Sequence, residues 1–128
     1  MDKKQLQQLL EEYSKSATGK PITLEAKNAA MEIWDFLEDS LSVMDRDLLA
    51  NFVVTPTSYG GVGMGFSGAG FEIDIYIQPR GGVEYSYTAN AESDDCRTVY
   101  NEGSNVIEVC VVFLAAMDEH PESAYVST

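Results

Sequence analysis

Three carboxylates and a tyrosine are the residues of this chain best placed to do chemistry. Apolar and polar residues alternate strictly from Phe71 to Gln78. If this segment is a β-strand, Glu72, Asp74 and Tyr76 share one face. Pairing with the next strand adds Glu84 to this face. Diagonal neighbours on paired strands lie about 7–8 Å apart, a separation that acid–base or glycosidic chemistry could use in a deep cleft. An open sheet face does not exclude water, so we expect a solvated or partner-binding surface instead of catalytic residues.

Three alternate glycines, Gly61, Gly63 and Gly65, lie on the strand predicted to precede this segment. A strand without outward side chains lets another backbone or a flat aromatic group approach closely, and at a sheet edge it could accept an added strand. The glycines could equally permit strong twist or cover by a loop. Residues Gly63 to Gly68 match the letters GxGxxG, but a hairpin follows them where a nucleotide site needs a helix N-terminus, so we predict no nucleotide site.

A second acidic set lies on a helix predicted from Thr23 to about Leu48. Apolar residues recur there at three- and four-residue steps, Thr23 is placed to cap the first turn, and a break near Ser42 fits the sequence. The far side of the helix is acidic. The candidate partner-binding residues are therefore Glu72, Asp74, Tyr76, Glu84, Gly61, Gly63 and Gly65 on the sheet, with Glu32, Asp35, Glu38 and Asp39 on this helix.

The remaining reactive residues do not indicate metal or nucleophilic chemistry. His120 is the only histidine and lies in a polar C-terminal segment. Cys96 and Cys110 fit no zinc or redox spacing; the first follows two aspartates, which disfavour a thiolate, and the second lies in an apolar run. No acidic cluster continues into a twelve-residue calcium loop. We predict no catalytic residues, no metal and no cofactor.

The turns of the meander predict how its strands pair. A four-residue glycine-rich loop between the first two strands places Phe66 opposite Phe71. The second turn, Pro79–Gly82, pairs Ile77 with Val83. Both pairings gather the apolar side chains on one core face, which we expect to hold Val62, Met64, Phe66, Ile73, Ile75, Tyr85 and Tyr87.

Helices are predicted on both sides of this meander. A leucine stripe indicates a helix over residues 2–15. Residues 105–117 favour a buried helix with Asn105 as its cap, although their β-branched residues also fit a strand. Residues 91–103 are predicted to be an acidic loop, and residues 52–55 are a candidate fourth strand. We predict one α+β domain over residues 1–128, an antiparallel three- to four-stranded meander with two N-terminal helices and one C-terminal helix packed on one face.

Charge restricts the partners of this chain. Its 128 residues include 21 Asp and Glu against 8 Lys and Arg, a net charge of −13. Such a field repels nucleic acid and anionic lipid and attracts basic proteins, although it also serves solubility. The N-terminus does not resemble a signal peptide, and the longest apolar run, Val109 to Met117, is too short to span a membrane. We expect a cytoplasmic protein without nucleic-acid or membrane partners.

These observations favour a small acidic non-enzymatic interaction protein of an inhibitor, antitoxin, immunity or phage anti-defence type, which binds a basic surface of a protein partner. The order of helices, meander and helix is loosely similar to that of many small bacterial or phage proteins, without a diagnostic motif. The alternative is a small-ligand binder or enzyme with a pocket between the sheet and the helices, lined by Trp34, Tyr85 and Tyr87. A homodimer is a further possibility.

Overall fold

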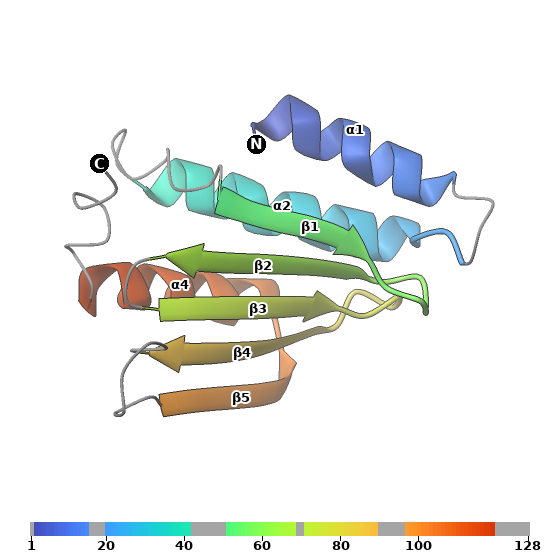
Figure 1. Ribbon diagram of the computed structural model, residues 1–128. Coiled ribbons are helices and arrows are strands. Elements are labelled where there is room, and N and C mark those ends of the chain that lie inside the picture. Colours follow the sequence, from blue (N-terminus) through green and yellow to red (C-terminus); the bar gives the residue numbers. More distant parts are fainter. Residues whose placement is uncertain (1, 16–19, 42–50, 69–70, 90–96, 120–128) are drawn as a thin grey trace.

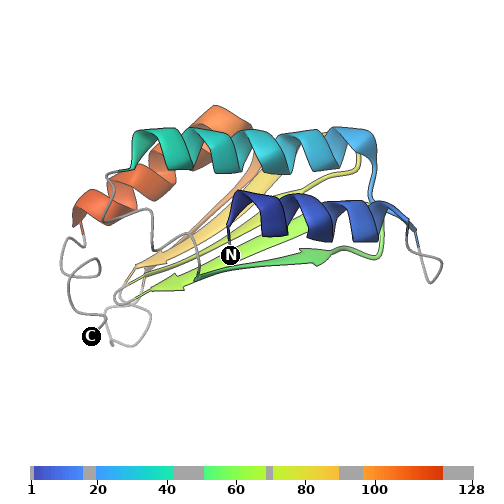
Figure 2. The ribbon, with the colours of Figure 1, turned by 90° about the horizontal axis from the view of Figure 1, so that it is seen from above.

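The computed structural model describes residues 2–15, 20–41, 51–68, 71–89 and 97–119. Five antiparallel strands form one sheet in the order β1-β2-β3-β4-β5 (Figure 1). The three helices of the described residues lie on one side of this sheet (Figure 2). The predicted α+β meander with two N-terminal helices and one C-terminal helix is therefore confirmed. The bounds are Lys3–Ser14 (α1), Leu24–Ser40 (α2), Phe52–Pro56 (β1), Val62–Gly68 (β2), Phe71–Ile77 (β3), Val83–Ala89 (β4), Arg97–Ser104 (β5) and Val106–Glu119 (α4).

Both N-terminal helices begin at residues whose side chains bind the first turn. Asp2 and Gln5 form a reciprocal capping box on α1. Thr23 accepts a hydrogen bond from the Ala26 amide at the start of α2, and its hydroxyl donates to the carbonyl of Pro79 in the β3–β4 turn. Helix α2 ends at Ser40, which is earlier than the predicted end near Leu48 and close to the predicted break; residues 42–50 lie outside the described part of the chain.

The strand registers follow the prediction on one side of β3 and differ on the other. Ile77 pairs with Val83, as predicted. Phe66, however, pairs with Ile73 instead of Phe71, because β2 continues to Gly68. The error is two residues, and since side chains alternate with period two, every side chain keeps its predicted face.

The predicted acidic loop over residues 91–103 is wrong in its second half. Residues 97–104 form β5, which pairs with β4 and has an irregularity near Val83 and Tyr85; residues 91–96 lie outside the described residues. The stretch Thr98-Val-Tyr100 contains strong strand formers, but it is short and polar residues surround it, so the sequence pattern did not predict a strand there. The predicted C-terminal helix is confirmed as α4, with the Asn105 side chain accepting a hydrogen bond from the Glu108 amide.

Helix α4 closes the core with one aromatic side chain. Phe113 is fully buried, and its ring centroid lies 5.5 Å from that of Phe52, 5.2 Å from Phe66 and 6.1 Å from Phe71. One helix residue therefore touches three neighbouring strands. Beside it, Cys110 is buried, and burial raises the pKa of its thiol to about 12. This cysteine is a neutral core side chain at physiological pH, as the sequence predicted.

Helix α1 protects the outer edge of the sheet. The hydroxyl of Tyr13 donates a hydrogen bond to the carbonyl of Val54 in β1, at a distance of 3.1 Å. Strand β1 is the edge strand next to β2, so an added strand would have to compete for this carbonyl. The glycine strand β2 lies inside the sheet, and the hypothesis of strand addition to it is therefore wrong.

Removing this edge contact gives the first testable prediction. We expect Tyr13→Phe to lower the free energy of unfolding by about 1 kcal/mol, because the ring stays packed while the hydrogen bond to Val54 is lost. Urea unfolding of the variant and the parent protein measures the difference. An unchanged midpoint would show that Tyr13 contributes only its ring.

Candidate functional site

The candidate site is the open face of the sheet, which we define as the side of β1–β4 that the helices leave uncovered. The alternation of β3 buries Phe71, Ile73, Ile75 and Ile77 and leaves Glu72 and Asp74 exposed. Tyr76 keeps 43% of its surface exposed on the same side. Glu84 of β4 is Tyr76's register partner, so the predicted grouping of these four residues on one face is present in the structure.

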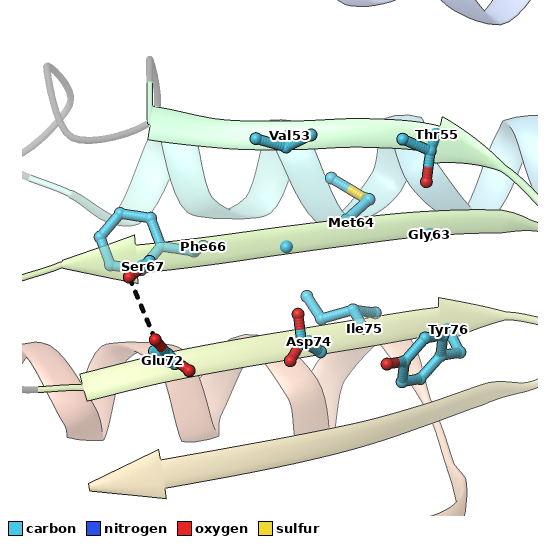
Figure 3. Close-up of a pocket in the computed structure, with 11 residues that line it drawn as sticks. Val53, Thr55, Gly63, Met64, Phe66, Ser67, Glu72, Asp74, Ile75 and Tyr76 are labelled. Atoms are coloured by element: carbon cyan, nitrogen blue, oxygen red, sulfur yellow. Dashed lines mark hydrogen bonds between the residues drawn. The ribbon is translucent and has the colours of Figure 1, made fainter. Parts of the chain in front are cut away.

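A hollow runs along the middle of the open face. Gly63 of β2 pairs with Thr55 on one side and Tyr76 on the other, and Gly65 pairs with Val53 and Asp74. Because neither glycine has a side chain, the flanking side chains enclose a groove of about 450 Å³ (Figure 3). We call this the glycine slot; its floor is Gly63 and Gly65, and its walls are Val53, Thr55, Asp74 and Tyr76.

The three predicted glycines have different structural roles. A Cβ atom on Gly61 would lie 2.2 Å from the carbonyl oxygen of Ile77, so the backbone there excludes any side chain. Gly61 is buried, and its amide donates a hydrogen bond to the Thr57 hydroxyl in the turn between β1 and β2. At Gly63 and Gly65 the nearest atoms are the Thr55 hydroxyl at 3.2 Å and an Asp74 carboxylate oxygen at 3.1 Å, both at the ends of side chains. A side chain at position 61 would therefore clash with the backbone, whereas a Cβ atom at either slot position requires only that the Thr55 or Asp74 side chain shift by a few tenths of an ångström.

The carboxylates of the open face have no basic neighbours in their own strands, since β1, β2, β3 and β4 contain neither lysine nor arginine. Glu72 accepts a hydrogen bond from the Ser67 hydroxyl at 3.4 Å, and Glu84 accepts one from the Gln78 amide at 2.8 Å. Asp74 has no hydrogen-bond or ion-pair partner among the described residues. The slot therefore contains an exposed carboxylate that no described residue binds and that a ligand could pair with.

The acidic set on α2 lies in the helical layer, on the other side of the sheet (Figure 2). Asp35 forms an ion pair with Lys3 of α1 at 2.8 Å, and this hydrogen-bonded partner raises the pKa of the lysine. Glu38 accepts a hydrogen bond from the indole nitrogen of Trp34 at 2.9 Å. Glu32 and Asp39 are exposed. Half of this set therefore supports the protein's own structure, and one flat partner surface could not reach both acidic faces.

The aromatics expected to line an internal pocket belong to the core. Trp34 and Tyr85 are buried, and the Trp34 ring packs edge-on against Phe52 with centroids 6.4 Å apart. Tyr87 is half-buried against Phe71. These contacts favour a structural role for the three side chains. Within the described ranges, no group of three or more His, Cys, Asp or Glu side chains could hold a metal ion.

The sequence predicted the acidic wall of the slot on β3 but not the opposite wall on β1. Val53 and Thr55 belong to β1, a strand that was only a candidate for the sheet, so their position beside the glycines was not predicted. Val53 and Thr55 alternate with the buried Phe52 and Val54, and this alternation is the sequence signal that could have predicted their position on the open face.

Comparison with protein-family models, curated proteins and solved structures found no match to this chain. None of the helices in the described residues is long and apolar enough to span a membrane.

Proposed function

We propose that this protein is a small acidic interaction protein that binds a basic surface of a protein partner through the open face, and that it acts by covering that surface. The observation that carries the proposal is the composition of the face. Its strands provide three carboxylates and no lysine or arginine, around a slot whose glycines the backbone packing does not require.

Electrostatics supports this direction of recognition. The chain has a net charge of −13, which would speed the encounter with a basic protein and repel acidic ones. The lysines of the described residues lie at positions 3, 4, 15, 20 and 27, in and around α1 and α2, and the arginines are Arg80 in the β3–β4 turn and Arg97 at the start of β5. Lys3 is paired with Asp35, and Lys15 and Lys27 both pair with Glu11. Strands β1–β4 therefore present carboxylates without a lysine or arginine of their own, which supports the open face as the candidate surface for a basic partner.

An inhibitor, antitoxin, immunity or anti-defence role fits such a protein, because each works by masking a surface of another protein without chemistry of its own. The helices lie on the opposite side of the sheet from the open face (Figure 2). The cytoplasmic location and the protein partner belong to the same proposal.

Capture from a cell lysate tests the proposal. The tagged protein, the open-face variant Glu72→Gln/Asp74→Asn/Glu84→Gln and the helical-side variant Glu12→Gln/Glu32→Gln/Asp39→Asn are used at low and high salt. We expect an identified basic protein to bind the parent and the helical-side variant, to be lost from the open-face variant, and to be released by salt. Capture of the same proteins by all three, or binding that salt does not change, would contradict the proposal.

A further inference from the structure

The dimensions of the glycine slot define what can enter it. Neighbouring strands lie about 4.8 Å apart, so the walls on β1 and β3 are separated by roughly 10 Å, and Gly63 and Gly65 are spaced about 7 Å along β2. The volume of about 450 Å³ is open to solvent on its outer side. A single extended or planar side chain fits this space, whereas a folded element would rest on the walls.

The walls combine apolar surface with one exposed charge that has no partner among the described residues. Val53 is 64% exposed on the β1 side, and the Tyr76 ring follows Asp74 along β3 (Figure 3). An Asp74 carboxylate oxygen lies 3.1 Å from the point where a Gly65 Cβ would be, so the charge leans over the floor of the slot. A guest must therefore offer both an aliphatic or flat body and a hydrogen-bond donor with positive charge.

Resting on the proposed function, we propose that the glycine slot receives an arginine side chain of the basic partner. Its methylene groups lie over Gly63, beside the Tyr76 ring, and its guanidinium group lies over Gly65 and pairs with Asp74. Arginine fits better than lysine, because a planar guanidinium group can bind a carboxylate through two parallel hydrogen bonds and can lie flat on the glycine backbone. An aromatic side chain alone would bury Asp74 without a partner, which costs free energy.

Nuclear magnetic resonance titration with the blocked tripeptides Ac-Gly-Arg-Gly-NH2 and Ac-Gly-Lys-Gly-NH2 tests this inference. We expect the arginine peptide to shift the amide signals of Gly63, Gly65 and Asp74 in a saturable way, with a dissociation constant of about 1–10 mM. The lysine peptide should bind at least about fivefold more weakly. Gly65→Val fills the slot and keeps every charge, so it should abolish the saturable shifts. Ser86→Val adds the same side chain on β4, beside Asp74 on the side away from the slot, and should retain them.

Two outcomes would overturn the proposal that the glycine slot binds an arginine side chain. The first is a set of shifts that spreads over all the acidic surfaces without saturation, and the second is equal binding by Gly65→Val and the parent. If Gly65→Val disturbs the sheet, Gly63→Ala/Gly65→Ala narrows the slot with less bulk and should weaken binding in the same direction. Partner capture separates the two proposals. If the open-face variant Glu72→Gln/Asp74→Asn/Glu84→Gln loses the partner and Gly65→Val retains it, the arginine slot is wrong and the proposed function stands. If both variants retain the partner, the proposed function is wrong as well.

Discussion

Replacing Phe113 with alanine is expected to lower the free energy of unfolding by about 3–5 kcal/mol, the largest effect we predict for a single residue. The side chain is fully buried, and its ring contacts Phe52, Phe66 and Phe71 on three neighbouring strands. Truncation leaves a cavity between α4 and the sheet that these rings can fill only in part. Urea or thermal unfolding measures the loss.

A matched control separates the packing of Phe113 from helix propensity. Ile107 lies on the same helix with 65% of its surface exposed, so Ile107→Ala should change stability by less than about 0.5 kcal/mol. If Phe113→Ala costs less than about 1 kcal/mol, α4 does not close the core in the way we describe.

The second large effect is expected at a glycine that lies outside the slot. Gly61→Ala would place a Cβ atom 2.2 Å from the Ile77 carbonyl oxygen. Because this oxygen belongs to the backbone, the clash can be relieved only if the turn before β2 shifts. We expect a loss of about 3 kcal/mol, at the upper end of the usual cost of overpacking. Gly65→Ala meets only the end of the Asp74 side chain, so its effect should stay within about 0.5 kcal/mol.

Comparing these two variants by urea unfolding tests whether the slot glycines are dispensable for folding. Equal losses at both positions would show that Gly65 is also required by packing, and the main reason for assigning the slot a binding role would disappear. The expected contrast would leave Gly65→Ala available as a folded variant for binding experiments.

The sequence predicts the acidic face well because strand alternation and a tight turn determine it. The turn at Pro79–Gly82 set the β3–β4 register correctly. The predicted pairing of β2 with β3 was shifted by two residues, because the glycine-rich sequence of the loop does not indicate the residue at which β2 ends. The faces were nevertheless right, because an error of two residues preserves the side of the sheet.

The parts that sequence reasoning missed depend on contacts between segments. Strand β5 is polar around a short run of strand formers, so only its pairing with β4 identifies it. The glycine slot needs β1 beside β2, and the different roles of Gly61 and Gly65 depend on which atoms lie within 3.2 Å of each. The use of Asp35 and Glu38 inside the helical layer likewise requires the positions of Lys3 and Trp34.

The most direct test of the central claim compares two variants with the same net charge. Glu72→Gln/Asp74→Asn/Glu84→Gln and Glu12→Gln/Glu32→Gln/Asp39→Asn each remove three of the 21 acidic side chains, one set from the open face and the other from the helical side. Their affinities for a fluorescent nona-arginine peptide are measured by titration at constant ionic strength. We predict that the open-face variant binds at least about tenfold more weakly than the parent, a difference of about 1.4 kcal/mol, while the helical-side variant stays within about threefold. Equal weakening of both variants would mean that net charge alone attracts the peptide, and would contradict the claim that the open face is the binding surface.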